Sequence, residues 1–362
     1  MFNIFKPKGQ SNVTSVHVVS ETNGQYEISE GISKRDLEKL SNNLKTRSIQ
    51  FSNPLSKNDI ALLETTVFCK RPDILLRVFG HYGKVCDLTF IGQIPSLRRF
   101  SADCLMDAKE IESVTTLKNL DELGVGIFNL DNFDFLKNID PNLKALSLHQ
   151  TRSSKPNIET IGRFSNLESL HLEGQQKGIE AIKHLHKLKE ITLRSISTNN
   201  VDYLAGLKDL WSVDIKLGGI KNFDGLMSLP NLKYLELWQV RGLKDLSFIS
   251  KLTTLQNLFV QSLKQVKELP SFDNLTALRR VSLENLKGLI DISTLKTAPA
   301  LNEFLYVLAE NQEPENLIPV LENPSVKSVF CRFGTTKKND SFDALALAHN
   351  KTEYKYNKFH YE

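Results

Sequence analysis

The feature that most constrains this chain is an apolar pattern that recurs every 21–25 residues. In each unit an apolar residue is followed by two other residues, a second apolar residue, one other residue and a third apolar residue. A period of this length, held over eleven units, indicates stacked repeats in which each unit covers the apolar face of its neighbour. The units start at Leu97, Leu120, Leu143, Leu167, Leu188, Leu210, Leu232, Leu255, Leu278, Leu301 and Val326.

Each unit predicts one strand followed by a tight return segment. In residues 232–237, Leu235 and Leu237 alternate with Glu236, which is the period of two that marks a strand with one buried face. After the strand the apolar period becomes three, which favours a 3₁₀ or short irregular helix. This second period is carried, for example, by Leu243, Leu246, Ile249 and Leu252.

The repeat resembles the bacterial short leucine-rich repeat, the internalin-like class, over residues 85–335. The resemblance implies an α/β repeat fold. The chain would form a leucine-rich-repeat solenoid with a curved parallel β-sheet on its concave face and irregular or 3₁₀ segments on its convex face. The family's usual asparagine after the strand is absent, so we expect apolar wedges there instead. The residues at that position are Leu105, Phe128, Thr151, Gln175, Ile196, Gly218, Val240, Leu263, Leu286, Ala309 and Gly334.

A solenoid needs a cover at each end, and we divide the chain accordingly. Residues 1–12 are a mobile N-terminus, 13–90 an α+β N-terminal capping region, 91–335 the array of about eleven repeats and 336–362 a short C-terminal cap. In the N-terminal region we expect a hairpin with a type I′ turn at Asn23-Gly24, and two helices capped by Ser33 and Ser56. The expected strands there are 16–19, 25–28, 48–51, 75–79 and 85–90, and the expected helices are 33–44 and 56–68.

The register between residues 70 and 97 stays unassigned, because the spacing from Val85 to Leu97 is too short for a repeat. At the other end, residues 341–349 predict a helix. An aromatic tail follows, which we expect to seal the last repeat and to cover Leu305, Val307 and Phe330. The alternative is that the tail is a docking peptide. Its aromatic residues are Tyr354, Tyr356, Phe359 and Tyr361.

The sequence contains none of the linear motifs that usually accompany catalysis or a bound cofactor, so we expect no enzyme, no cofactor and no metal. His184 and His186 are interpreted as surface residues, and Cys331 as a core residue. The 46 basic and 42 acidic residues differ by four, too small a bias to favour nucleic acid. The absence of an export signal or membrane span leads us to expect a cytoplasmic protein without a membrane role.

The outward residues of successive strands should form three columns on the concave face, because neighbouring strands stack in register. In the sixth to eighth repeats the left column is Ser212, Tyr234 and Asn257, the middle column Asp214, Glu236 and Phe259, and the right column Lys216, Trp238 and Gln261. Aromatic side chains among charges have the composition of a binding hot spot. The alternative is that they pack laterally and only stabilise the sheet. The predicted partner-binding residues are Tyr234, Trp238, Phe259, Glu236, Lys216, Asp214, Arg194 and Arg280.

These features favour a non-enzymatic scaffold that binds a partner protein through the concave face, as a monomer. The resemblance adds one specific form, a cytoplasmic immunity protein that inhibits a toxin. The alternatives are a secreted, host-directed effector or adhesin, and the regulatory subunit of an enzyme. The identity of the partner does not follow from the residues.

Overall fold

The computed structural model describes residues 16–81 and 84–362, and the chain divides into two compact units. The first unit runs to Leu130 and includes Asn138–Asp140. The second comprises Asp131–Lys137 and Pro141–Glu362. The predicted mobile segment 1–12 lies outside the described residues. The first unit therefore holds the N-terminal cap and the first two repeats, and the second unit holds the other repeats and the C-terminal cap.

The main sheet of the first unit has the strand order β1-β2-β3-β4-β6-β8, antiparallel between β1 and β2 and parallel elsewhere. Its strands are β1 (Val16–Ser20), β2 (Gln25–Ile28), β3 (Ser48–Phe51), β4 (Leu75–Gly80), β6 (Arg99–Leu105) and β8 (Glu122–Ile127). A separate parallel pair joins β5 (Cys86–Asp87) to β7 (Ala108–Lys109). The helical elements are α1 (Lys34–Asn42), α2 (Lys57–Leu63), the π-helical η1 (Glu64–Phe68), and the 3₁₀ segments η2 (Leu88–Gln93) and η3 (Ile111–Thr116).

The predicted hairpin and both helix caps are present, but the hairpin turn differs from the prediction. Ser20 pairs with Gln25, and the Gly24 N–H donates to the Glu21 carbonyl at 3.2 Å, so the loop has four residues. Only Gly24 in this loop has a positive φ, 63°, whereas a type I′ turn needs two such residues. A Cβ at Gly24 would lie 1.8 Å from the Lys45 carbonyl oxygen. Glycine is therefore required at this position for two reasons, the positive φ and the close approach of the Lys45 backbone.

The unassigned register before residue 97 turns out to be regular, because β3, β4 and β6 stack in parallel like later repeats. Leu76 pairs with Phe100, and Ile49 pairs with Leu76. The apolar pattern is hidden in these two units. Thr46 stands three residues before Ile49 where an apolar residue is expected, and Ile74 precedes Leu76 by only two residues.

The predicted strand at 85–90 is wrong beyond its first residues. Only Cys86–Asp87 is extended, and the 3₁₀ segment η2 begins at Leu88. The Asp87 carboxylate accepts the backbone N–H of Thr89 at 3.0 Å and also its hydroxyl at 2.7 Å. An aspartate that accepts from the residue two positions on starts a turn and ends the strand.

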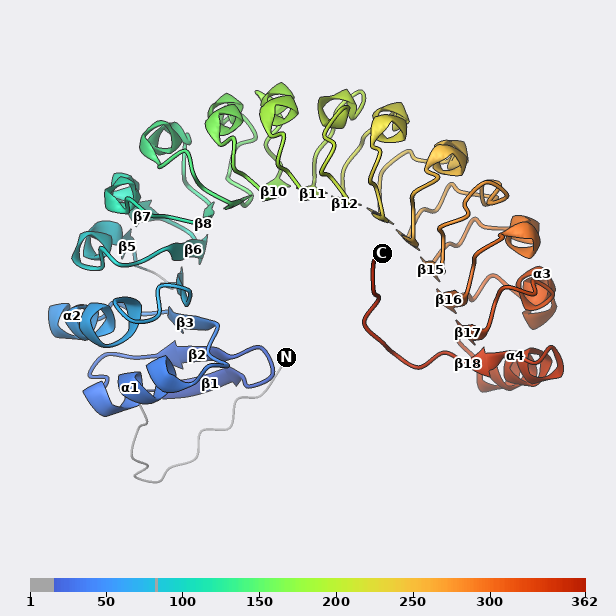
Figure 1. Ribbon diagram of the computed structural model, residues 1–362, viewed down its shortest axis with the longest axis horizontal. Helices are drawn as coiled ribbons and strands as arrows, with labels where there is room; N and C mark the ends of the chain where they lie inside the picture. The colour runs from blue at the N-terminus through green and yellow to red at the C-terminus, as the bar shows by residue number, and fades with distance from the viewer. Residues whose placement is uncertain (1–15, 82–83) are drawn as a thin grey trace. The chain divides into compact units, whose positions relative to one another are not determined.

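The second unit is a single stack of parallel strands in chain order, with return segments on the outer side (Figure 1). The strands are β9 (Ala145–Leu148), β10 (Ser169–Glu173), β11 (Glu190–Arg194), β12 (Ser212–Lys216), β13 (Tyr234–Trp238), β14 (Asn257–Gln261), β15 (Arg280–Glu284), β16 (Glu303–Val307), β17 (Ser328–Cys331) and β18 (Thr352–Glu353). Along β9 to β17 buried apolar residues alternate with more exposed ones at most positions, as the period of two predicts, whereas both residues of β18 are exposed. The predicted leucine-rich-repeat architecture is confirmed.

The predicted 3₁₀ returns are also present in most repeats from residue 131 on. They are η4 (Asp134–Asn138), η5 (Glu159–Arg163), η6 (Ile179–His184), η7 (Asp202–Leu204), η8 (Asp224–Ser228), η9 (Ser247–Lys251), η10 (Ser293–Thr297) and η11 (Pro314–Leu317), the last leading into α3 (Ile318–Leu321). Their period of three places one side chain per turn against the back of the sheet, because a 3₁₀ helix has three residues per turn.

The residues at the expected wedge positions are mostly buried, but not all of them are apolar wedges, because Thr151 and Gln175 are polar and Gly218 and Gly334 have no side chain. Phe128 is 38% exposed, and Gln175 is buried although it is polar. The Gln175 amide donates to the His149 carbonyl at 2.9 Å and accepts the Glu173 N–H at 3.1 Å. Gln175 thus satisfies turn backbone groups, which is the role that the missing asparagine would have. The wedges that are buried as expected include Leu105, Ile196, Val240, Leu263, Leu286 and Ala309.

The C-terminal cap begins with a longer helix than predicted. Helix α4 (Thr336–Ala348) starts after Thr335, whose hydroxyl accepts the Lys338 N–H, and it buries Phe342 and Ala346. Strand β18 then pairs with β17 and closes the last repeat's free edge. Cys331, on β17, is fully buried as a core residue, and this burial raises the pKa of its thiol.

Candidate functional site

The eight predicted partner-binding residues lie on five consecutive strands, β11 to β15, in the columns that the sequence predicts. Ser212, Tyr234, Asn257 and Arg280 pair in one row. Asp214, Glu236 and Phe259 pair in the next row, and Lys216, Trp238 and Gln261 in the third. The register follows from burial, because a slip of one residue would turn every apolar side chain of a strand away from the core.

A charged network is centred on Asp214 and Glu236 of the middle column and extends to Lys216 and Tyr234 in the columns beside it. The Lys216 ammonium lies 2.7 Å from a carboxylate oxygen of Asp214 and 3.2 Å from one of Glu236. The Tyr234 hydroxyl donates to the other oxygen of Glu236 at 2.7 Å. One lysine thus neutralises two carboxylates that stand on adjacent strands. The second oxygen of Asp214, Oδ1, is buried and has no hydrogen-bond partner among the described residues.

This arrangement leaves Asp214 poorly stabilised as an anion. Burial raises the pKa of Asp214 to about 6, the hydrogen bond from Lys216 opposes that shift, and the negative charge of Glu236 adds to it. Burial likewise raises the pKa of the Tyr234 phenol, and its contact with Glu236 reinforces the shift. The surface therefore holds an under-satisfied acceptor, at a cost in folding stability near neutral pH.

Replacing Asp214 by asparagine is expected to raise the free energy of unfolding at pH 7 by about 1–2 kcal/mol. Because its pKa is higher in the folded chain than in the unfolded one, Asp214 favours the folded state below about pH 4 and loses that contribution as the pH rises to about 6. Denaturant titrations of both chains between pH 4 and pH 7 measure the difference. Asp209→Asn, at an exposed aspartate of the same repeat, is the matched control and should change little at any pH.

Trp238 stands in the right column beside two cations, which come from the two preceding strands. The Arg194 guanidinium lies 5.9 Å from its ring centre and the Lys216 ammonium 5.7 Å. Phe259 is its diagonal neighbour on the next strand, and both rings remain partly exposed. An aromatic ring held beside cations on a rigid sheet can accept a further flat or apolar group at little entropic cost.

The C-terminal tail occupies the left column, which the sequence did not predict. Residues 354–362 leave β18 and run along the inner side of the second unit (Figure 1). Tyr361 packs against Trp211 and Tyr234 at ring-centre distances of 4.9 and 6.4 Å, and its hydroxyl accepts a hydrogen bond from Asn257 at 3.2 Å. Phe359 lies over Arg279 and Arg280 at 4.8 and 4.9 Å.

The last residue of the tail, Glu362, is held by contacts with two side chains of the sheet. Glu362 exchanges two hydrogen bonds with the Gln256 side chain, each 3.0 Å long, and its carboxylate lies 2.9 Å from Arg279. The tail was expected to cover Leu305, Val307 and Phe330, but these residues stay partly exposed. The Arg332 guanidinium lies 4.2 Å from the centre of the Phe330 ring.

The tail therefore divides the predicted group of residues. Tyr234 and Arg280 contact the tail; Arg280 is only 8% exposed, whereas Tyr234 stays partly exposed beside Tyr361. The residues Arg194, Asp214, Lys216, Glu236, Trp238 and Phe259 lie in the middle and right columns and remain partly exposed. We call these six residues the central patch.

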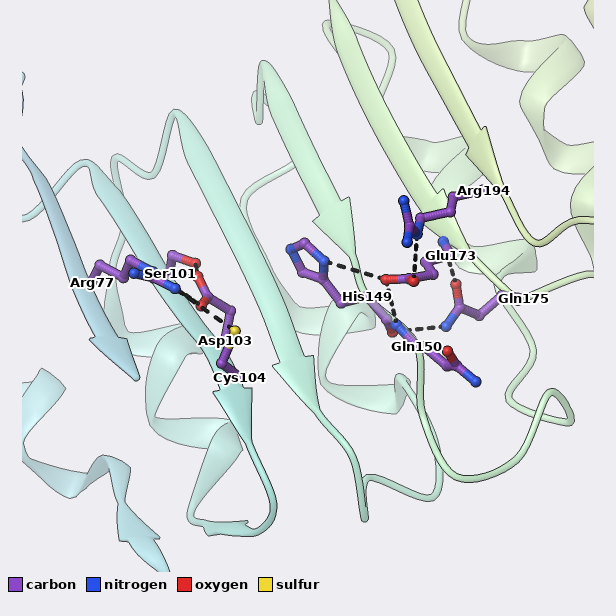
Figure 2. Close-up of polar contacts among 9 residues, drawn as sticks. All are labelled: Arg77, Ser101, Asp103, Cys104, His149, Gln150, Glu173, Gln175 and Arg194. Carbon is purple, nitrogen blue, oxygen red and sulfur yellow. Dashed lines mark hydrogen bonds and ion pairs between the residues drawn. The ribbon is translucent and has the colours of Figure 1, made fainter. Parts of the chain in front are cut away.

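A second cluster lies on β10 and the end of β9 and was not singled out from the sequence. A ring nitrogen of His149, one of His171 and a carboxylate oxygen of Glu173 lie within 4.8 Å of one another. The two rings are 5.1 Å apart, and Arg194 donates to Glu173 at 2.8 Å. Burial lowers the pKa of His171 to about 4, and the neighbouring His149 adds to the shift. Figure 2 shows His149, Glu173 and Arg194 pointing toward one another.

The first unit contains a buried ion pair of its own, also drawn in Figure 2. The Arg77 guanidinium binds both carboxylate oxygens of Asp103, and it donates a further hydrogen bond to Gln50 at 3.0 Å. Burial opposes ionisation of Asp103, but the hydrogen bonds from Arg77 and Ser101 hold its pKa below the usual range. Both charges in this group are paired, so we interpret its role as structural: it links the side chains of β3, β4 and β6.

The remaining observations concern the cysteines, two histidines and the apolar character of the helices. The four cysteines, Cys69, Cys86, Cys104 and Cys331, are free. His184, the last residue of η6, and His186, two residues later, are exposed as predicted. Within residues 16–81 and 84–362, no helix has both the length and the apolar character that crossing a membrane requires.

Comparison with known proteins identifies the fold. No family model matches the sequence, and no curated protein matches it. An internalin from Listeria monocytogenes has a similar structure, with a TM-score of 0.57 and 18% sequence identity over 87% of this chain and 88% of that one. A leucine-rich-repeat protein from Leptospira interrogans matches with a TM-score of 0.46 and 14% identity, over 90% and 99% of the two chains. The resemblance to internalin-like repeats is thus confirmed for the fold, and the chain has the leucine-rich-repeat fold.

Proposed function

We propose that this chain is a non-enzymatic scaffold that binds a partner protein through the central patch. The observation that carries the proposal is the pairing of two partly exposed aromatic rings, Trp238 and Phe259, with the partly exposed charges of Lys216 and Glu236 on one rigid surface. Aromatic anchors supply contact area, and the partly exposed charges around them can select a partner of complementary charge.

The rigidity of the surface supports the proposal. The central patch residues stand on β11 to β14, which pair with their neighbours along their whole length. A surface that is already ordered loses little conformational entropy when a partner binds. The salt bridges and cation–aromatic contacts also hold the side chains of Lys216 and Trp238 in place before binding.

The central test compares two double variants in affinity capture and in a binding titration with the recovered partner. Trp238→Ala with Phe259→Ala should weaken binding by about 30- to 1,000-fold, since hot-spot truncations cost roughly 2–4 kcal/mol. The matched control is Met227→Ala with Ile290→Ala, which removes apolar side chains that are 42% and 73% exposed on return segments. It should bind like wild type. Equal recovery of the same partner by both double variants would refute the central patch.

A finer form of the proposal is that the partner is a toxin and that the chain inhibits it in the cytoplasm by covering its active site. A preformed concave sheet suits this task, because inhibition requires tight binding of one folded guest. The check is the partner's own activity. It should fall to zero at one chain per partner molecule, and it should be restored when the Trp238→Ala, Phe259→Ala chain replaces wild type.

A further inference from the structure

The cluster of His149, His171 and Glu173 has the donor set of a transition-metal site. It contributes two imidazole nitrogens and one carboxylate oxygen, all within 4.8 Å of one another. Two-histidine, one-carboxylate sets are used for Zn²⁺, whose bonds to such ligands are about 2.0–2.2 Å long. Tetrahedral ligands would then stand about 3.4 Å apart. The His149 Nδ1 to Glu173 Oε2 distance of 3.7 Å is already close to that spacing.

Two of the three groups have a ligand atom with unused capacity. His171 Nε2 is buried and has no hydrogen-bond partner among the described residues. A buried nitrogen of this kind is costly unless it receives a proton donor or a metal ion. The Glu173 carboxylate is divided: Oε1 accepts from Arg194 at 2.8 Å, whereas Oε2 is directed to His149 and to the Gln150 N–H, 3.4 Å away. Oε2 is therefore the oxygen available to an ion.

The backbone that carries the ligands is held by one side chain. Gln175 donates to the His149 carbonyl at 2.9 Å and accepts the Glu173 N–H at 3.1 Å, so it ties the two strand ends together (Figure 2). Gln175 is 1% exposed and replaces the asparagine that this position usually has in such repeats. It acts as a positioning residue, because it fixes the spacing between His149 and Glu173 without contacting the ion itself.

We propose that His149, His171 and Glu173 form a binding site for a divalent transition-metal ion, Zn²⁺ being the best fit, with one coordination position open to the concave surface of the second unit. Three protein ligands and an open position are typical of a site where water or a ligand completes the coordination. The Arg194 guanidinium orients Glu173, but its positive charge also weakens cation binding. The ion should therefore exchange readily and be removed by chelators. This inference does not depend on the partner proposed above.

The test is a titration of the chelator-treated full chain with ZnCl₂ by calorimetry, together with the visible spectrum of the Co²⁺-loaded chain. Wild type should bind one ion, and its melting temperature should rise with the free ion concentration. The His149→Ala chain should lose this binding, and so should the His171→Ala chain. Gln175→Leu should weaken it by about 10- to 100-fold while leaving the Co²⁺ spectrum tetrahedral, as expected of a positioning residue.

The matched control is His184→Ala with His186→Ala, which removes two exposed histidines of the neighbouring return segment. It should bind one Zn²⁺ with wild-type affinity. His149 is partly exposed at the end of β9, so His149→Ala is expected to fold normally, and its circular dichroism establishes this. The proposal is overturned if wild type shows no saturable 1:1 binding. It is also overturned if a folded His149→Ala chain binds as tightly as wild type.

Discussion

Replacing Gly218 by valine is expected to lower the free energy of unfolding by about 3 kcal/mol. A Cβ at this position would lie 2.0 Å from the carbonyl oxygen of Ile196 and 3.0 Å from its carbonyl carbon. Both atoms belong to the backbone of the previous repeat and cannot rotate away. The turns must separate, which strains the hydrogen bonds from Gly219 N–H to Ile196 (3.0 Å) and from Arg241 N–H to Gly218 (2.7 Å).

Equilibrium denaturation of the full chain measures this loss, with Gly92→Ala as the control. A Cβ at Gly92, in η2, would meet no atom within 4 Å, so that substitution should change stability by less than about 0.5 kcal/mol. If Gly218→Val stays within about 1 kcal/mol of wild type, the close contact between these two turns is wrong.

Gly218 also shows what the repeat pattern predicts and what it leaves open. The period of two places Asp214 and Lys216 on the same face as Trp238, and the structure has them in that register. Burial of one face fixes that register, so the strands could be aligned from the sequence alone. The turn that follows each strand is less constrained, because an apolar wedge, an amide such as Gln175 or a glycine that permits close approach each fill the same place.

The repeat pattern also failed to identify the two repeat-like units of the N-terminal cap, those of β3 and β4. Thr46 is fully buried at a position where the repeat calls for an apolar side chain, and Ile74 is displaced by one residue. Period counting treats both as breaks. The strands themselves were still predictable, because Leu76 lies in a short apolar run and Ile49 alternates with polar neighbours, and both stretches end at turn residues.

The His149, His171 and Glu173 cluster was within reach of the sequence but not of a motif search. Its ligands come from two repeats, and they become neighbours only when the columns are aligned across strands. A search along the chain finds closely spaced pairs such as His184 and His186, which are exposed. The useful signal is two histidines and a carboxylate in adjacent column positions.

The path of the tail was harder to predict, because its aromatic residues fit several apolar surfaces equally well by composition. The edge of β17 and the side chains of Leu305 and Phe330 were nearer along the chain. The tail extends farther because polar residues at the start of β14 and β15, notably Asn257 and Arg280, offer it specific hydrogen bonds and cation–aromatic contacts. Such pairings depend on three-dimensional geometry.

Replacing Tyr361 by alanine is expected to lower the free energy of unfolding by about 2 kcal/mol. The change removes ring contacts with Trp211 and Phe359, 4.9 and 4.8 Å between centres, and the hydrogen bond from Asn257. Tyr356→Ala is the matched control, since this second tyrosine of the same tail is 94% exposed and should contribute less than about 0.5 kcal/mol. Similar losses in the two chains would show that the tail does not lie on the sheet.

The Tyr361→Ala variant also shows whether the tail and the central patch act independently in partner binding. In a Trp238→Phe background, Trp211 is the remaining tryptophan, and Tyr361→Ala should shift its emission to longer wavelength as water reaches the ring. Partner affinity of Tyr361→Ala should stay within about twofold of wild type, because the ring contacts of Tyr361 are with Trp211, Tyr234 and Phe359, none of which belongs to the central patch. The tail's contacts lie in the left column, whereas Trp238 and Phe259 lie in the other two. A large change in affinity in either direction would mean that the partner's surface extends onto the tail.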